Sequence, residues 1–252
     1  MKLYLTSLLI LTGITLGNAQ NFTYGLKAGT NFSNGGQIRG ESFKENGEYV
    51  YWTGTSQGQT KTGYHGGGFL EVGFGDFFLR PEVVYTSIQS EFIFPNKSSV
   101  YSIKKLDLPF LIGYNIRNVA GLYAGPVYSP MFSNELQYKE ATIIKKEENI
   151  WIKGSSLNEP SVPVNLQIGL KSEFNQLGLD LRYEYSLAGS DPERVDMLNS
   201  TIGREEGGIN VATVEEAGLS QIILSLTYKF NTGEDTGRRR GGYSYSRRRR
   251  TR

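Results

Sequence analysis

Apolar and polar residues alternate along the chain in eight stretches of about ten residues each. Because successive side chains of a β-strand point to opposite faces, each stretch predicts a strand with one apolar and one polar face. The predicted strands cover residues 22–32, 64–74, 77–86, 105–114, 122–132, 164–171, 177–185 and 221–230. At about 3.3 Å per residue and a tilt near 40°, such a strand spans roughly 25 Å, the height of the apolar band of a membrane barrel.

The connections between the predicted strands are alternately long and short. The short ones lie at 75–76, 115–120 and 175–176, and the long ones at 33–62, 87–102, 133–163 and 188–218. This arrangement predicts an all-β fold, an eight-stranded antiparallel transmembrane β-barrel with both termini in the periplasm and long extracellular loops. In the last long connection, Asp191 before Pro192 is typical of a helix start and predicts a short helix from Glu193 to Leu198.

Alternation alone leaves two kinds of barrel open, because a soluble barrel such as a lipocalin turns its apolar face inward. Aromatic residues near the strand ends, such as Phe22, Tyr85 and Phe230, favour a membrane barrel with interfacial girdles. Glycines on the polar face favour it too, since they weaken an exposed strand but leave room inside a narrow lumen. These glycines are Gly25, Gly29, Gly67, Gly73, Gly113, Gly125, Gly169 and Gly178.

The polar face also carries equal numbers of positive and negative charges. The bases are Lys27, Arg80, Lys105, Lys171, Arg182 and Lys229, and the acids are Glu71, Glu82, Asp107, Glu173, Asp180 and Glu184. Opposite charges can pair in a confined lumen, where an unpaired buried charge costs several kcal/mol. Because side chains fill the interior of an eight-stranded barrel, we expect this charge network to plug the lumen and to prevent passive passage of solutes.

The N-terminus is typical of an export signal. Lys2 precedes a mostly apolar run from Leu3 to Leu16, and cleavage is expected after Ala19. A retained anchor is the alternative, although the run is shorter than the roughly 20 residues of a spanning helix. The predicted parts are a signal peptide over residues 1–19, a barrel over 20–230 and a disordered Arg-rich periplasmic tail over 231–252.

Composition narrows the picture further. Cysteine is absent, which excludes disulfides and thiolate metal sites. The mean hydropathy is −0.36, so membrane residence has to come from strands, in which polar residues offset the apolar ones. The net charge of +2 hides an uneven distribution, because eight arginines lie between Arg238 and Arg252 while the barrel region is acidic.

We interpret the basic tail as a tether to a periplasmic partner, with an inert extension as the alternative. Its predicted contacts are Arg238, Arg239, Arg240, Arg247, Arg248, Arg249 and Arg250. An acidic protein, an acidic envelope polymer or anionic lipid headgroups are suitable partners. Nucleic acid is not expected as a partner, since the periplasm offers none.

Several stretches resemble the PorT-like family of outer-membrane β-barrels. They are YGLKAGTNFS from Tyr24, PEVVY from Pro81, LDLPFLIGY from Leu106, YAGPVYSPMF from Tyr123, LDLRYEYSL from Leu179 and the final LTYKF. The resemblance extends from Phe22 to Phe230 and implies an outer-membrane barrel of a Gram-negative bacterium. The namesake takes part in type IX secretion and gliding, while most relatives have no assigned role, so the resemblance leaves an accessory role in such a machinery as one open function. The tail lies outside this pattern, so the aromatic insertion signal of Leu226, Tyr228 and Phe230 is internal to the chain.

Candidate chemistry is sparse. The single histidine, His65, lies on the polar face near the outer rim, where a barrel enzyme could use it as a base. No local motif supplies a nucleophile and an orienting acid, so we interpret it as a polar lumen side chain. No cofactor is predicted, and the scattered loop acids lack the spacing of metal ligands. Aromatic residues of the long connections are candidates for surface contacts or for packing loops together: Tyr49, Tyr51, Trp52, Phe92, Phe94 and Trp151.

The sequence therefore predicts a non-enzymatic outer-membrane barrel with a plugged lumen that acts in envelope or surface interactions. Its expected partners are outer-membrane lipid and a periplasmic or cell-surface protein or acidic envelope polymer. Three classes of function stay open: an accessory of a secretion machinery, a surface adhesin or receptor, and a lipid-modifying barrel enzyme.

Overall fold

The computed structural model describes residues 21–33, 36–40, 54–94, 98–116, 120–139, 151–156, 163–187, 192–196, 211–215 and 220–230. The predicted signal peptide and the predicted tail lie outside these residues. Within them, no helix is long and apolar enough to cross a membrane.

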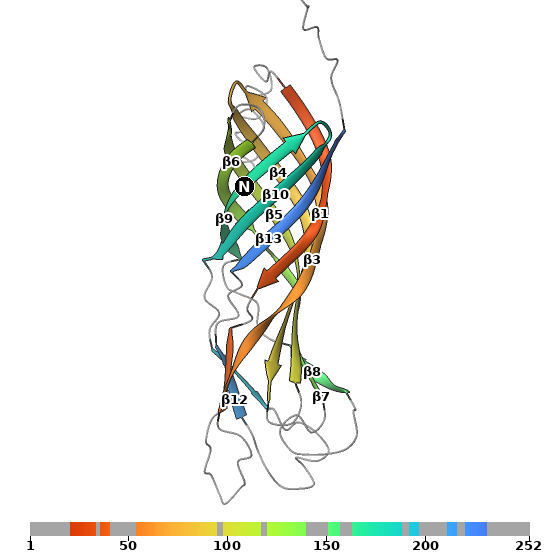
Figure 1. Ribbon diagram of the computed structural model, residues 1–252. Coiled ribbons are helices and arrows are strands. Elements are labelled where there is room, and N and C mark those ends of the chain that lie inside the picture. Colours follow the sequence, from red (N-terminus) through yellow and green to blue (C-terminus); the bar gives the residue numbers. More distant parts are fainter. Residues whose placement is uncertain are drawn as a thin grey trace, which may run out of the picture.

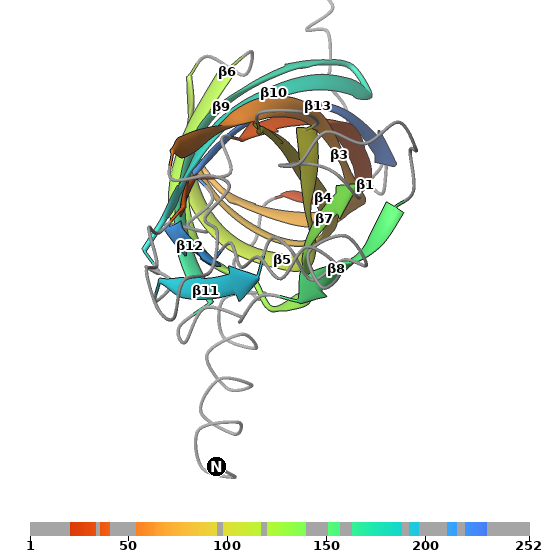
Figure 2. The ribbon, with the colours of Figure 1, turned by 90° about the horizontal axis from the view of Figure 1, so that it is seen from below.

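Eight strands close into an antiparallel ring, which confirms the predicted fold class (Figures 1 and 2). In ring order they are β1 (Asn21–Ser33), β3 (Thr55–Phe74), β4 (Phe77–Ile93), β5 (Ser98–Ile116), β6 (Ala120–Tyr128), β9 (Val164–Phe174), β10 (Leu177–Ser186) and β13 (Gln221–Phe230). The ring closes at β1, where Ala28 pairs with Leu226 of β13 on one side and with Gly66 of β3 on the other. No strand of this ring therefore has a free edge along the barrel wall.

The apolar face of each ring strand points outward. Leu226 is 67% exposed and Ile168 is 61% exposed, whereas the neighbouring Thr227 and Gln167 are buried in the lumen. Exposed leucine and isoleucine side chains around a whole barrel are unfavourable in water and favourable in lipid. The burial pattern therefore favours the membrane barrel over the soluble one.

Aromatic side chains form two sets at opposite ends of the wall. At the end that holds the short turns, the ring of Tyr24 stacks on that of Phe230 with centroids 5.3 Å apart. At the other end, Tyr85 lies between Tyr64 (6.2 Å) and Phe132 (5.9 Å). Amphipathic rings gather at membrane interfaces, so the two sets mark the limits of the apolar band.

Two of the predicted short connections are tight turns. Gly75 has φ +65° and Asn175 has φ +55°, a left-handed conformation that glycine and asparagine adopt most readily. These residues allow two-residue turns between β3 and β4 and between β9 and β10. Of the third predicted connection, residues 117–119 lie outside the described residues.

The long connections were predicted as loops, but the described parts of them contain strands. β3, β4 and β5 continue past the end of the barrel, where five further strands join them. These are β2 (Gln37–Gly40), β7 (Met131–Lys139), β8 (Trp151–Ser156), β11 (Glu193–Asp196) and β12 (Val211–Glu215). Together they form an open sheet in the order β11-β12-β2-β3-β4-β5-β7-β8, which we call the projecting sheet. Figure 2 shows β11, β12, β7 and β8 around the mouth of the barrel.

The helix predicted from Glu193 to Leu198 is wrong for its described part. Glu193–Asp196 is strand β11, in which Arg194 pairs with Thr213 and Val195 with Ala212 of β12. A helix-start signal is local, and hydrogen bonding to a neighbouring strand prevails over it here.

The strands that leave the barrel exchange their two faces. Within the barrel, the inner face of β4 and β5 carries charged residues such as Arg80, Glu82 and Asp107. Beyond Thr86, the same inner face carries large apolar side chains, all at most 4% exposed: Ile88, Phe92, Phe94, Tyr101 and Ile103. The outer face changes in the opposite sense, from Val83 and Phe110 to Glu91 and Lys104. The projecting sheet therefore has the faces of a protein in water, while the barrel has the faces of a protein in lipid.

Candidate functional site

The lumen of the barrel holds a continuous network of charged side chains. Its centre is a middle cluster formed by Lys27, Arg80, Glu82, Asp180 and Arg182. Arg182 donates two hydrogen bonds to Glu82, from Nη1 to Oε2 (2.8 Å) and from Nη2 to Oε1 (2.7 Å), and two more to Asp180 (2.7 and 2.8 Å). Such two-pronged pairing holds both partners in one geometry. Glu82 also lies 3.1 Å from Lys27 Nζ and 2.8 Å from Arg80 Nε.

A second group, the turn-end cluster, consists of Glu71, Lys171, Glu173 and Lys229. Lys171 donates to both oxygens of Glu71, at 2.7 and 2.6 Å, and lies 3.2 Å from Glu173. Lys229 donates to Glu173 at 2.5 Å. Two bases thus face two acids, and each base contacts both acids.

A third group, the mouth cluster, is formed by Lys105, Asp107 and Glu184. Lys105 Nζ lies 2.5 Å from Glu184 and 2.9 Å from Asp107. Neutral side chains donate to both oxygens of each acid. Ser129 donates to the Asp107 oxygen that faces Lys105 and Thr86 to the other one. Asn165 and Gln221 donate to the Glu184 oxygen that faces Lys105 and Gln167 to the other one. These donors compensate for the second acid, because a buried carboxylate needs all its oxygens satisfied.

Two side chains join the three clusters. Arg80 Nη1 lies 3.5 Å from Glu71, which connects the middle cluster to the turn-end cluster. Gln167 accepts from Arg182 at 3.1 Å and donates to Glu184 at 2.6 Å, which connects the middle cluster to the mouth cluster. The structure therefore brings together all nine residues predicted for the lumen network: Lys27, Glu71, Arg80, Glu82, Asp107, Lys171, Asp180, Arg182 and Glu184.

Sequence reasoning missed the neutral members of the network. Gln167 alternates with apolar neighbours in β9, which predicts that it lies on the polar face, but the pattern cannot show which charge it contacts. The alternation in β6 likewise predicts Tyr123 on that face, and the structure shows that its hydroxyl donates to Asp180 at 2.5 Å. Both contacts depend on the register between neighbouring strands, which cannot be derived from the sequence alone.

Three luminal glycines make room for aromatic rings rather than directly for charged chains. Each glycine pairs across strands with an aromatic residue, and a Cβ on the glycine would collide with that ring: Gly25 with Phe69, Gly113 with Phe78 and Gly169 with Tyr123. The three rings in turn lie under cations, Arg80 at 3.9 Å, Lys171 at 3.8 Å and Arg182 at 5.0 Å from the ring centroids. Glycine, ring and cation thus form a repeated unit that fills the lumen and stabilises its positive charges.

His65 is buried in the lumen wall, where its Nε2 lies 2.8 Å from Ser225 Oγ. Among the described residues, its Nδ1 has no hydrogen-bond partner, and Ser225 is fully buried. A serine triad needs an accessible nucleophile and an acid that orients the histidine. The described geometry supplies neither, and within it no group of acids and histidines could hold a metal ion.

The aromatic candidates for surface contacts are not equivalent. Phe92 and Phe94 are buried on the inner face of the projecting sheet, so the structure corrects the surface-contact interpretation for these two. Phe92 packs on Tyr101, with ring centroids 6.2 Å apart. Trp151 begins β8 opposite Lys139, and Tyr49, Tyr51 and Trp52 lie outside the described residues.

The residues of the predicted insertion signal lie on the outer wall of β13. Leu226 and Tyr228 are exposed there, and Phe230 contacts both Tyr24 and Tyr228 with centroids 5.3 Å away. The arginines predicted to contact a periplasmic partner lie outside the described residues.

Comparison with known proteins agrees with this architecture. Residues 18–191 match the family described as "Outer membrane protein beta-barrel domain". No curated protein matches the sequence significantly.

Two solved structures are similar in fold. One is Ail, the attachment invasion locus protein of Yersinia pestis, in complex with the heparin analogue sucrose octasulfate: the TM-score is 0.39 and the identity 12%, over 84% of this chain and 100% of Ail. The other is the outer membrane protein OprG from Pseudomonas aeruginosa: the TM-score is 0.44 and the identity 11%, over 85% of this chain and 99% of OprG. Likenesses this distant indicate no ligand or partner for the chain.

Proposed function

The chain belongs to the outer membrane protein β-barrel domain family, and from this premise we propose that it is a closed, non-enzymatic barrel that acts as a surface interaction protein through its projecting sheet. The exchange of faces in β4 and β5 is the observation that carries the proposal. Strands that only close a membrane barrel could end at the aromatic set around Tyr85. β4 and β5 instead continue beyond it and bury a separate apolar layer under a polar outer face. Such a structure is suited to water and to binding a partner there.

The proposed orientation has the projecting sheet outside the cell. The start of β1 and the end of β13 are then both in the periplasm. This orientation is supported by the turns at Gly75 and Asn175, which lie at the end of the barrel opposite to the projecting sheet, as periplasmic turns do. The start of β1 and the end of β13 lie at this same turn end (Figure 1).

Cysteine labelling tests this orientation, because the native chain has no cysteine. Gln59, exposed on β3 in the projecting sheet, and Asp76, exposed in the turn, are each replaced by cysteine in separate variants. A membrane-impermeant maleimide added to intact cells is expected to label the Gln59→Cys variant and to spare Asp76→Cys until the outer membrane is opened. Labelling of Asp76→Cys alone in intact cells would reverse the proposed orientation.

The absence of conduction is the second part of the proposal. The ion pairs of the three clusters and the three aromatic rings support a plugged lumen. In planar bilayers, the purified barrel is expected to give no discrete ion current at voltages where an open porin conducts. Regular channel openings by the wild-type chain would overturn this part of the proposal.

A more specific candidate is an accessory of a secretion or motility machinery. It is supported by the stretches that resemble the PorT-like family and by the basic tail, which offers a periplasmic contact on the same molecule. Cross-linking in intact cells, with the full chain and with residues 231–252 removed, separates the candidates. Loss of periplasmic partners on removal of the tail favours the accessory role, whereas partners retained only through the projecting sheet favour an adhesin or receptor.

The enzyme alternative has one residue on which to test it. If the barrel modified lipid through His65, the His65→Ala variant would lose a change in lipid A that the wild-type chain produces in a deletion strain. We expect the lipid A mass spectra of strains carrying the two chains to be identical.

A further inference from the structure

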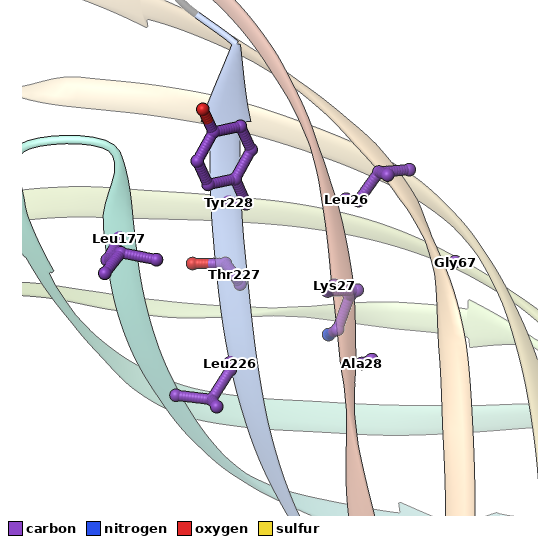
Figure 3. Close-up of a pocket in the computed structure, with 8 residues that line it drawn as sticks. All are labelled: Leu26, Lys27, Ala28, Gly67, Leu177, Leu226, Thr227 and Tyr228. Carbon is purple, nitrogen blue, oxygen red and sulfur yellow. The ribbon is translucent and has the colours of Figure 1, made fainter.

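The membrane-facing wall is hollowed on both sides of β1. One hollow, of about 450 Å³, lies across β10, β13, β1 and β3, and Leu177, Leu226, Tyr228 and Leu26 line it (Figure 3). A second hollow, of about 310 Å³, lies across β1, β3 and β4, with Tyr24, Leu70 and Val83 among its lining residues. The exposed lining of both hollows is almost entirely apolar.

Small residues on the outer face of β1 and β3 cause these hollows. Ala28 pairs with Gly66, and Leu26 pairs with Gly68, so two adjacent positions of β3 carry no side chain toward the membrane. A Cβ placed on Gly66 would have no heavy atom nearer than 3.8 Å, and one on Gly68 none nearer than 3.5 Å. In contrast to the luminal glycines, no ring of the protein fills this space.

The larger hollow lies near the short turns. Leu177 follows the turn at Asn175-Gln176 directly and pairs with Tyr228. The Tyr228 hydroxyl donates to Gln176 Oε1 at 3.2 Å, which holds this ring at the end of the apolar band. Tyrosine prefers the level where acyl chains meet headgroups, so the hollow begins at that interface and extends inward along the wall.

We propose that this hollowed wall seats an acyl chain of a phospholipid from the leaflet on the side of the short turns. Inside a membrane, a void against the wall forfeits dispersion contacts, so an apolar occupant that reaches the floor is favoured. Leu26 lies between the two hollows, since its Cδ2 is 4.0 Å from the Cβ position of Gly68. A flexible chain can pass such a ridge and follow the narrow floor on both sides.

A second barrel fits the same surface poorly. Its convex, rigid wall would rest on the projecting side chains of Leu26, Leu177 and Leu226, and would leave the floor at Ala28 and Gly68 empty. The choice of phospholipid over lipopolysaccharide depends on the proposed orientation, which puts the short turns in the periplasm and hence the hollow in the inner leaflet. The seat itself depends only on membership of the outer-membrane family.

Filling the hollow tests the proposal. The double variant Ala28→Leu/Gly68→Leu enlarges one small lining residue of each hollow, Ala28 in the larger and Gly68 in the smaller. The matched control Ala124→Leu enlarges an exposed outward residue of β6. The folded proteins, selected by their heat-modifiable mobility on gels, are purified from outer membranes and examined by native mass spectrometry. The wild-type chain and Ala124→Leu are expected to retain one phosphatidylethanolamine, with occupancy about tenfold lower in the double variant.

Three outcomes would overturn the proposal. Equal retention in the double variant and in Ala124→Leu would show that the lipid binds elsewhere. A wild-type dimer that the double variant cannot form, found by cross-linking in membranes, would assign the hollow to a second copy. Retention of lipopolysaccharide in place of phospholipid would overturn the choice of leaflet, and the cysteine-labelling result would then show whether the orientation or the lipid class was wrong.

Discussion

At the scale of single residues, contacts between side chains on neighbouring strands determine the arrangement of the lumen. Gly113 leaves room for the Phe78 ring beside it, and Lys171 Nζ lies 3.8 Å from the centroid of that ring. The charges are arranged in the same way, since the Arg182 side chain donates hydrogen bonds to Glu82, Asp180 and Gln167. A change at one position therefore acts on side chains from several strands.

The glycine units yield a first prediction. In Gly113→Ala, the new Cβ would collide with the Phe78 ring and come within 2.7 Å of the Leu122 carbonyl oxygen. Because overpacking forces neighbours out of place, we expect a loss of about 1–3 kcal/mol in the free energy of unfolding. Gly66→Ala is the control, since its Cβ would meet only the Lys27 carbonyl oxygen, at an unstrained 3.8 Å. Urea unfolding in lipid vesicles, followed by circular dichroism, measures both variants, and equal midpoints would contradict the role given to Gly113.

The buried charges yield a second prediction. Arg182→Met removes the partner shared by Glu82 and Asp180 and leaves both carboxylates in a closed lumen, so we expect a loss of about 3–5 kcal/mol in stability. Lys61→Met breaks an ion pair of similar length, 3.0 Å to Glu91, whose side chains are 39% and 28% exposed. That control should cost at most about 1 kcal/mol, because solvent screens the pair. The same unfolding assay compares them, and a small loss in both would show that the luminal pairs are screened as well.

At the scale of elements, β4 and β5 show both the reach and the limit of the sequence pattern. Within the barrel, the period of two assigned Val83 outward and Glu82 inward, and the structure agrees. At Ser87 the apolar positions move to the other parity, to Ile88 and Phe92, and an analysis that assumes one constant face takes the change as the end of a strand. The parity change in fact marks the level at which lipid gives way to water.

Features that depend on contacts between distant parts of the chain could not be predicted from the sequence. The two-residue turn at Gly75 was predictable, because its signal is local. The pairing of β11 with β12, or of Gln167 with Glu184, depends on register and on residues far apart in the chain. One sequence supplies the polarity of each position, and only the assembled ring shows which polar group each one meets.

The exchange of faces yields a third prediction, at the scale of the projecting sheet. Phe92→Ala empties a site on its buried inner face, whereas Ile93→Ala shortens a neighbouring side chain that is already exposed. Loss of a buried phenyl group costs about 3–5 kcal/mol, and the sheet can open without the barrel. We expect protease to cut the projecting sheet of Phe92→Ala at least about tenfold faster than that of Ile93→Ala, with the barrel fragment intact in both. Equal cleavage rates would show that Phe92 does not hold this sheet together.

At the scale of the whole molecule, the barrel and the projecting sheet share strands but are suited to opposite surroundings, lipid and water. The barrel puts Leu226 and its equivalents into lipid and fills its interior with paired charges, while the sheet buries Ile88 and Phe92 and shows polar groups to water. Because β3, β4 and β5 belong to both, the closed barrel holds the sheet at a fixed place above the mouth. A partner bound there would be anchored to the membrane by the barrel.

The proposed plug of the lumen yields the last prediction. In Arg80→Ala/Arg182→Ala, two large side chains leave the middle cluster, while Glu82 and Asp180 stay and lose most of their positive partners. The vacated space becomes lined by negative charge, so the barrel should conduct small ions and prefer cations over anions. The control Lys61→Ala/Lys104→Ala removes the same charge from residues outside the lumen network and should stay silent. Planar-bilayer recordings under a salt gradient give both conductance and selectivity; a silent or anion-selective luminal variant, with its folded state checked by heat-modifiable mobility, would mean that the two arginines do not close the lumen.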